Sequence, residues 1–430
     1  MSILIKNVLV SDYRSAFHEQ KIHLRIQEGS IAQIQAADEL PSLLHKETVM
    51  EAEGLYLSPG WIDMRVLVPE PGHEHRETLH SARLAAQKGG FTQVALLPNT
   101  VPVIQRKNEV AFLKALNAEA LVHFYPMAAL TRHTKGEDFT EMIDLHQAGV
   151  VAFTDGIHPL NDPDLLRKCL LYLQYFDGLL INRPEETQLT RFGQMNEGRQ
   201  STLLGLTGMP ALAEDLMVMR DLEILRYTGG KLHLGLVSTQ KSVGLIRAAK
   251  AEGLKVSCDV AVHQLYFLDE DLANFDTHLK VNPPFRGRQD QEALWQGLAD
   301  GTIDAIVSDH SPQDIEQKHL EFDLAAFGII GLETLFSVLW EANQRRGEAQ
   351  LPLPLLLEKI SHRPRELLGL PPAQISEGVP ANLTLFSLHS PWTPSAQTLA
   401  SLSQNSPFLG HTFEAQPKMV FHHHFFYQNA

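Results

Sequence analysis

Cysteine is scarce in this chain, with only Cys169 and Cys258 among 430 residues. This low content argues against a disulfide framework of the kind that supports many small secreted proteins, and it favours a reducing compartment. The N-terminal segment "MSILIKNVLV" has no basic region before a long apolar run, so no signal peptide is expected. Apolar stretches of the ~18 residues that span a bilayer are also missing. We therefore predict a cytoplasmic protein.

Basic residues are also fewer than acidic residues. Lys and Arg number 36 against 51 Asp and Glu, which gives a net charge of −15. A nucleic-acid or anionic membrane surface needs clustered basic residues, so neither partner is expected. An anionic substrate would have to meet a local positive group.

Short apolar strands alternate with helical stretches from residue 58 to residue 375. The alternation fits a (β/α)8 TIM barrel, and a doubly wound open sheet is the alternative that the same pattern allows. The predicted strands are "WIDMRVLV", "TQVALLP", "LVHFYPMAA", "GVVAFTDG", "GLLINRP", "KLHLGLVS", "LKVSCDVAVH" and "IDAIVSDH".

Both ends of the chain have β-like sequences instead. Residues 1–57 contain "ILIKNVLV" and "HLRIQEGSIAQIQA", and residues 376–430 contain "ANLTLFSL" and "PKMVFHHHFFYQ". We predict that the two ends pair into one small composite β-sandwich domain beside a barrel of residues 58–375.

The active sites of such barrels lie at the C-terminal ends of the strands. Period-two alternation places Arg65 and Leu67 on the same side of the first strand. The polar or otherwise notable residues at the later strand ends are Asp155, Arg183, Leu236, Ser238, Asp259, His263, Asp309 and His310.

Several blocks of sequence together resemble the dihydroorotase family of cyclic amidohydrolases, which also includes allantoinases and hydantoinases. The blocks are "SPGWIDMRV", "PNTVPV", "QMNEGRQSTLLGLTGMPALAEDLMVMRDLEI", "LVSTQKSVGLIRAAKAEGLKVSCDV", "LKVNPPFRGRQ", "IDAIVSDHSP" and "AAFGIIGLET". They occur in order over most of residues 58–335.

The resemblance implies one or two divalent metals, usually zinc, with a metal-bound hydroxide that attacks the ring amide. A metal is needed because it lowers the pKa of water from about 15.7 towards ~7. The histidines that would bind it in the family fall here on Arg65, Leu67, Arg183 and Leu236. Only the carboxylates of Asp155 and Asp309 remain as candidate ligands, and Asp309 would match the family's catalytic acid.

The resemblance implies only some of the family's substrate contacts in this chain. Asn99 and Asn282 match family positions, whereas the carboxylate-binding arginine falls on Pro69 and a late histidine on Gln313. The sequence therefore retains some of the expected polar contacts but lacks the principal cationic one.

Arg65 and Arg183 place positive charges near the positions that the metal would occupy. Arginine is not a metal ligand, so we expect these side chains to pair with Asp155 or Asp309 or to hold an anion. The remaining charges of the "RPEE" run are expected to be solvated.

The other histidines have less specific interpretations. His73 and His75 form a His-x-His pair, but they follow the first strand and are expected in a loop. His233 fits a hydrogen-bonded core position, and His263 fits either a core or a ligand-facing position. The "FHHHFF" run at 421–426 is expected to lie in one apolar strand without metal.

These observations favour a non-catalytic homologue of dihydroorotase in pyrimidine biosynthesis. Its barrel would serve as a structural or regulatory partner of aspartate carbamoyltransferase or of an active dihydroorotase, and we expect a homo-oligomer. One alternative is an active enzyme that interconverts dihydroorotate and N-carbamoyl-L-aspartate with an unusual metal on Asp155 and Asp309. Another is a small-anion binding protein that uses Arg65 or Arg183.

Overall fold

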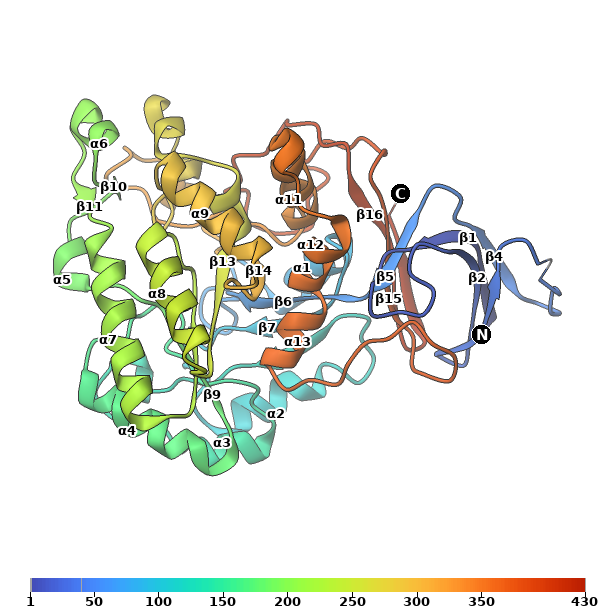
Figure 1. Cartoon of the computed structure of the whole chain (residues 1–430), viewed down its shortest axis with the longest axis horizontal. Coiled ribbons are helices and arrows are strands. Elements are labelled where there is room, and N and C mark those ends of the chain that lie inside the picture. Colours follow the sequence, from blue (N-terminus) through green and yellow to red (C-terminus); the bar gives the residue numbers. More distant parts are fainter. Residues whose placement is uncertain (1, 40, 430) are drawn as a thin grey trace.

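The computed structural model describes residues 2–39 and 41–429. Met1 and Ala430, the outermost residues of the expected small domain, lie outside the described residues, as does Leu40. A large barrel and a smaller β-rich part lie side by side, with both chain ends on the smaller part (Figure 1).

The larger part is a closed parallel barrel. Its strands pair in sequence order, and Phe153 bridges both Ala128 and Leu180 at the fourth position. A parallel bridge between Val66 and His310 closes the ring, so the barrel is confirmed and the open-sheet alternative is wrong. The barrel strands are β6 (Trp61–Val66), β7 (Phe91–Leu96), β8 (His123–Pro126), β9 (Leu179–Asn182), β12 (Lys231–Leu234), β13 (Val256–Ala261) and β14 (Ala305–Val307).

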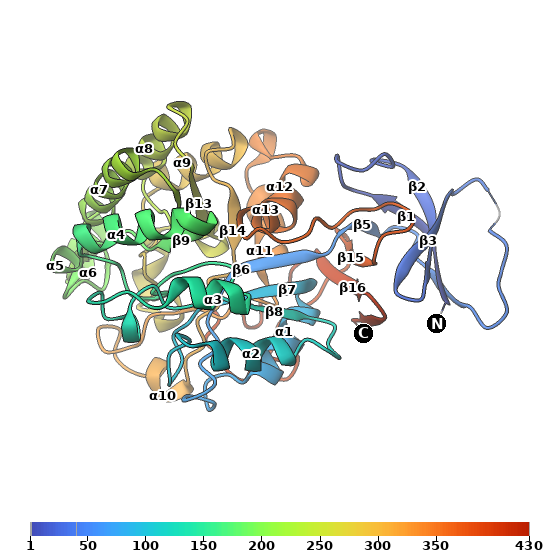
Figure 2. The same cartoon turned by 90° about the horizontal axis from the view of Figure 1, so that it is seen from below.

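Helices surround this ring on its outer side (Figure 2). One of them, α4, shows why they start where they do: it begins at Pro163, and the Asp162 side chain accepts hydrogen bonds from the first-turn N–H groups. The helices are α1 (Leu79–Lys88), α2 (Lys107–Ala115), α3 (Met142–Ala148), α4 (Pro163–Leu173), α5 (Thr187–Thr190), α6 (Arg199–Leu204), α7 (Leu212–Thr228), α8 (Gln240–Ala251), α9 (Arg288–Ala299), α10 (Ile315–Lys318), α11 (Leu335–Gln344), α12 (Leu353–Ile360) and α13 (His362–Leu367).

Short elements lie in the connections after the barrel strands. They comprise the two-residue pair β10 (Met195–Asn196) and β11 (Gly208–Met209) and several 3-10 turns. The turns are η1 (Arg132–Thr134), η2 (Gln174–Phe176), η3 (Val262–Leu265), η4 (Asp269–Asn274), η5 (Thr277–Leu279) and η6 (Gly347–Ala349).

The chain ends form one mixed sheet in the order β17-β16-β15-β5-β1-β2-β3, with β4 paired to β1, as expected for the small composite domain. The "HHH" run lies in a hairpin, because β16 ends at His422 and β17 begins at Phe425; the expectation of one continuous strand was wrong. The strands are β1 (Ser2–Val10), β2 (Lys21–Gln27), β3 (Ser30–Ala36), β4 (Thr48–Glu51), β5 (Tyr56–Pro59), β15 (Asn382–Ser387), β16 (Gln416–His422) and β17 (Phe425–Gln428).

The two parts share an aromatic contact and a long connection. Trp61 of the barrel lies 5.6 Å from Phe386 of the sheet and 4.7 Å from Phe336 of α11, measured between ring centroids. The connection 388–415 leaves the sheet, and Asn405 donates hydrogen bonds to Ser311 and Gly328 of the barrel. In the described part of the chain, no helix has the length and apolar character needed to cross a membrane.

Candidate functional site

Arg65 lies at the centre of the barrel mouth. It is on β6, and its Nε donates to Oδ1 of Asp309 at 3.0 Å while its Nη2 donates to the Gly156 carbonyl at 3.3 Å. Both members of the ion pair are buried, at 4% and 8% exposure. The expectation that Arg65 pairs with one of the two aspartates is therefore confirmed for Asp309.

Neighbouring backbone and carboxylate groups fix this pair. Asp63 accepts hydrogen bonds from the N–H of Arg65 at 2.9 Å and of Ser308 at 3.0 Å, which joins β6 to the end of β14. Complete burial raises the pKa of Asp63 to about 6. Burial likewise raises the pKa of Asp309, and the adjacent Arg65 limits that rise.

Asp155 has different partners. Its Oδ1 accepts from the Thr131 N–H at 2.8 Å and its Oδ2 from the Thr131 hydroxyl. Burial raises its pKa to about 6. Asn99 does not face open space, because its side chain bonds the Asp155 carbonyl and the Ile157 N–H. Of the two aspartates expected as partners of an arginine, Asp155 instead has both carboxylate oxygens bonded by Thr131.

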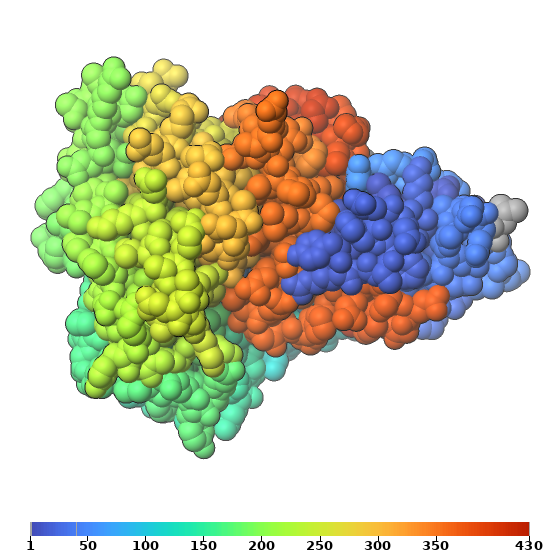
Figure 3. Space-filling view, in the orientation of Figure 1, coloured from blue at the N-terminus to red at the C-terminus, as the bar shows by residue number. Residues whose placement is uncertain are grey.

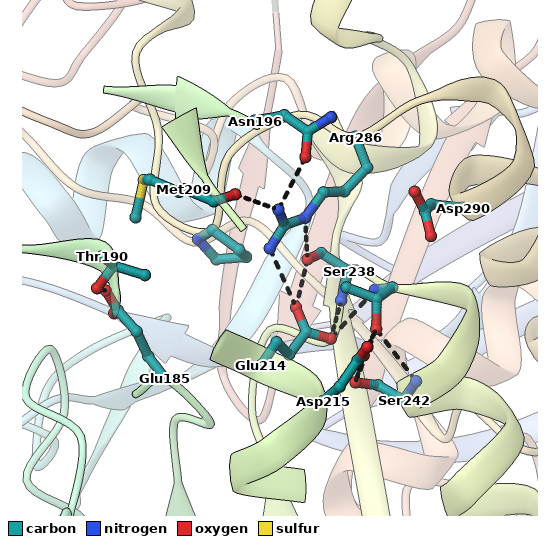
Figure 4. A network of polar contacts seen from close by, with 12 residues as sticks. Glu185, Thr190, Asn196, Met209, Glu214, Asp215, Ser238, Ser242, Arg286 and Asp290 are labelled. Carbon is teal, nitrogen blue, oxygen red and sulfur yellow. Dashed lines mark hydrogen bonds and ion pairs between the residues drawn. The ribbon is translucent and has the colours of Figure 1, made fainter. Parts of the chain in front are cut away.

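Arg183 contradicts the expected pairing with Asp155 or Asp309. Its guanidinium instead forms a hydrogen-bonded ion pair with Glu185, two residues along the chain. Glu185 is buried, so the expectation that the charges of "RPEE" are solvated was wrong for this residue. It also accepts from the neighbouring Thr190 (Figure 4). Asn282 Nδ2 donates to Glu185 at 3.1 Å, so Asn282 is engaged as well.

Arg286 organises a second buried network beside this one (Figure 4). Its Nε donates to the Ser238 hydroxyl at 3.0 Å, and its Nη1 donates to Asn196 Oδ1 at 2.9 Å and to the Met209 carbonyl at 3.0 Å. Glu214 lies 3.8 Å from the guanidinium and accepts the Ser238 N–H at 2.8 Å. The network ties the β10–β11 pair and α7 to the end of the sixth barrel strand.

Two of the replaced ligand positions have joined the hydrophobic core. Leu67 and Leu236 are buried in one apolar cluster that also contains Ile62, Ile181 and Val307 from other barrel strands. Leu236 has a φ of 59°, a conformation that costs energy for a branched side chain and is usual at functional or strained sites. Hydrocarbon therefore fills space at the mouth where the family resemblance places imidazoles.

The other histidines lie largely as expected. His233 is a buried core residue whose ring nitrogens contact Ser257 at 2.8 Å and Asp259 at 2.9 Å, which confirms the prediction. His263 packs edge-on against Phe285 in the core, and burial lowers its pKa to about 3.

The His-x-His pair lies in a loop. His73 and His75 are between β6 and α1, and His75 contacts Asp314 at 3.4 Å. His310 points away from Arg65 and pairs with buried Glu77 at 3.3 Å.

The donors at the mouth do not fit a divalent metal. Zinc sites use at least three protein ligands, usually imidazole, thiolate or carboxylate. Among residues 2–39 and 41–429 no group of three or more His, Cys, Asp and Glu is arranged to hold a metal. The two surviving carboxylates are used by Arg65 and Thr131.

The cavity on the Arg183 side of the mouth is small. The cavity bounded by Arg183, Glu185, Leu236, Asn282 and Arg286 has a volume of about 10 Å³. That is space for about one water molecule, whereas small-molecule sites measure about 300–1,000 Å³. The site as described is a closed, cross-linked polar core.

Glu185, Glu214 and Arg286 are site residues that the sequence patterns did not predict. The "NPPFR" and "MNEG" blocks that carry the resemblance contain Arg286 and Asn196, and they were the available signal. Glu214 lies in the block "GMPALAEDL" without any local feature that marks its burial.

Comparison with known proteins gives consistent results at the sequence level. The family model described as "Dihydro-orotase-like" matches residues 54–242. A dihydroorotase of Pelotomaculum thermopropionicum is 40% identical over 423 residues, which are 97% of this chain and 96% of the relative. A dihydroorotase of Geotalea daltonii is 39% identical, with 95% of each chain covered.

Solved structures give the same architecture. The L-hydantoinase from Arthrobacter aurescens superposes with a TM-score of 0.85 at 21% identity, covering 99% of this chain and 95% of its own. A D-hydantoinase structure superposes with a TM-score of 0.83 at 20% identity, covering 99% and 95%. At these identities the likeness shows the fold, a (β/α)8 barrel with a small β-sandwich domain.

Proposed function

The chain belongs to the dihydroorotase family, and we propose that it is a non-catalytic member that serves pyrimidine biosynthesis as a structural or regulatory partner. The observation that carries this proposal is the buried Arg65–Asp309 pair at the barrel mouth. It puts a permanent cation where the family has a metal ligand and occupies the carboxylate that would match the catalytic acid.

The chemistry of ring hydrolysis supports this proposal. Attack on a ring amide at neutral pH needs a hydroxide, and a bound metal provides one by lowering the pKa of water. Here the candidate ligands are two arginines, two leucines and two engaged carboxylates. A guanidinium cannot ligate a metal, and an alkyl side chain has no donor atom. The cavity of about 10 Å³ beside Arg183 leaves no space for a substrate ring.

The relatives are named dihydroorotases, which favours a second candidate. This is an active dihydroorotase that interconverts dihydroorotate and N-carbamoyl-L-aspartate. Its metal would have to lie on Asp155 and Asp309. Zinc is the metal to test, since it is the family's usual ion.

A metal determination combined with a ring-hydrolysis assay separates the two candidates. The protein is purified from zinc-supplemented medium without chelator, and the dihydroorotase of Geotalea daltonii is treated identically as the control. We expect metal far below one equivalent and no turnover in either direction. Stoichiometric zinc with turnover that is lost on chelation would overturn the non-catalytic proposal.

A partner would need a docking surface, and α7 offers one. Apolar side chains recur along its outer face at helical spacing, and α5–α7 lie at the end of the molecule remote from the small domain (Figure 3). The exposed apolar residues of this face are Leu212, Leu216, Met219 and Tyr227, and the exposed ion pair of Glu223 and Arg226 lies between the last two.

Assembly is tested with the aspartate carbamoyltransferase and the active dihydroorotase of the same organism. Size-exclusion chromatography with light scattering should show a complex with one of them, and Met219→Glu should weaken it. Phe112→Glu, an exposed apolar position on α2, is the matched control and should leave the complex intact. Failure to associate with either protein would contradict the partner role.

A further inference from the structure

A second cavity lies at the rim of the barrel, separate from the closed mouth. It measures about 570 Å³ and is bounded by the β6–α1 loop, η5, the segment around α10 and the connection 388–415. This volume lies within the range of small-molecule sites. We call it the rim pocket, and its lining residues include His75, His278, Gln313, Ile315, Lys318 and Leu402.

Lys318 is the central charged group of the rim pocket. It is only 4% exposed, and its ammonium donates to the carbonyls of Ala326 at 2.8 Å and Gly328 at 3.2 Å. A lysine ammonium has three donors, so one proton remains for another acceptor. No carboxylate of the described residues forms an ion pair with it, and burial lowers its pKa to about 7.

The acidic residues of the rim pocket are already balanced. Asp314 lies 3.4 Å from His75 and 3.6 Å from Arg76, measured between the ring or guanidinium nitrogen and Oδ2. Asp276 is bonded to His278 at 3.0 Å. Lys318 therefore has one ammonium proton without an acceptor and no direct ion pair among the described residues, although the charge of Asp276, beside the lining residue Thr277, also acts on it.

Gln313 and two apolar side chains provide the other ligand contacts of the rim pocket. The Gln313 Oε1 is buried and has no hydrogen-bond donor, while its Nε2 is held by the Phe327 carbonyl at 2.9 Å. An unsatisfied buried acceptor is costly and requires a donor. Ile315 and Leu402 are exposed by 72% and 53% at the opening, where they offer contact to a ring or alkyl body.

We propose that the rim pocket binds a small organic anion, a carboxylate or phosphate on a ring or apolar body that also carries an N–H or O–H donor. Lys318 is its counter-ion, and Gln313 accepts from its donor. This inference does not depend on the proposed function: Gln313 matches a substrate-contact position of the family, but the cavity that it lines is separate from the one beside Arg183 and Leu236.

Lys280 allows the structural role of a buried lysine to be separated from ligand binding. It is 1% exposed and, like Lys318, donates to two backbone carbonyls, those of Phe322 at 2.7 Å and Asp323 at 3.0 Å. It does not line the rim pocket. Lys318→Gln and Lys280→Gln therefore both keep a donor for the loop carbonyls and remove a charge, but only the first removes a group that lines the pocket. Because the charge of Lys280 lowers the pKa of Lys318, Lys280→Gln should leave Lys318 more fully protonated.

The test uses the full chain and isothermal titration with 4-hydroxybenzoate, its neutral analogue 4-hydroxybenzamide, phenyl phosphate and inorganic phosphate. We expect an anion to bind about tenfold or more tightly than the neutral amide, the difference that 1.4 kcal/mol provides. Lys318→Gln should abolish that preference and Lys280→Gln should keep it. The tighter of the carboxylate and phosphate probes identifies the headgroup.

Leu402→Glu is a second variant, at the opening of the pocket. Because Leu402 is exposed, this substitution should not disturb folding. It should weaken anion binding without changing the thermal midpoint. Equal affinity for anion and amide, unchanged anion binding by Lys318→Gln, or no binding of any anion by the wild-type chain would each overturn the proposal. Zinc content and turnover, which test the proposed function, are separate measurements.

Discussion

At the scale of single residues, Arg65 neutralises a carboxylate that would otherwise be buried without a partner. Removing one member of a buried ion pair typically costs about 3–5 kcal/mol, because the other charge stays in the low-dielectric interior. We expect Arg65→Met to lower the free energy of unfolding by this amount, measured by urea denaturation.

The double variant Arg65→Met/Asp309→Asn is the control for that prediction. It removes both charges, and asparagine tolerates the φ of 49° at position 309, so the double variant should recover most of the lost stability. If the single and double variants lose the same free energy of unfolding, the effect is due to changed packing and is not due to an unpaired buried charge.

A second residue-scale prediction concerns the pH dependence of stability. Glu333 is buried, its carboxylate accepts the N–H groups of Ala400 and Ser401, and burial raises its pKa from 4.5 to about 7. The folded state therefore binds a proton that the unfolded state releases between these values. Its contribution to stability is largest below pH 4.5 and is lost as the pH rises to about 7.

Glu333→Gln isolates this group. The amide stays neutral, so the variant should gain stability relative to the wild type as the pH rises through that window. Urea denaturation at several pH values measures the difference between the two proteins. A difference that stays constant with pH would contradict the assignment to Glu333.

At the scale of elements, α4 depends on its N-cap. Asp162 accepts from the N–H groups of Asp164 at 2.8 Å and Leu165 at 3.0 Å. Asp162→Ala should cost about 1 kcal/mol in urea denaturation. Asp164→Ala, in the same turn, removes only exposed ion pairs with Arg167 and Lys168 and should cost less, about 0.5 kcal/mol. Comparable losses would indicate that the cap bonds are not responsible.

The strands and their connections differ in how well the sequence predicts their contacts. Strand alternation and apolar periodicity identify the barrel strands. Because the C-terminal ends of these strands meet at one rim, they also predict that Arg65 lies close to Asp309. The Arg183–Glu185 pair was not predictable in this way, because it depends on the course of the loop after β9. Arg286 was missed for a related reason, since Asn196 and Met209 reach it from a short strand pair in that connection.

At the scale of the whole molecule, one aromatic cluster joins the barrel to the small domain. Phe386 is fully buried and lies 5.6 Å from Trp61 and 4.9 Å from Phe336. Phe386→Ala should lower the free energy of unfolding by about 3–5 kcal/mol. Because the cluster belongs to both parts, tryptophan fluorescence and far-UV circular dichroism should report one shared transition. Separate transitions in the wild-type chain would refute this coupling.

The order of strands in the small sheet governs how the chain folds during its synthesis. β5 pairs with β1 on one side and β15 on the other, and β15 in turn pairs with β16. The ribosome makes the whole barrel between β5 and β15, so one edge of β5 stays unpaired throughout that time. Exposed strand edges are templates for association with other chains. The nascent chain is therefore most vulnerable to aggregation just before its last strands emerge.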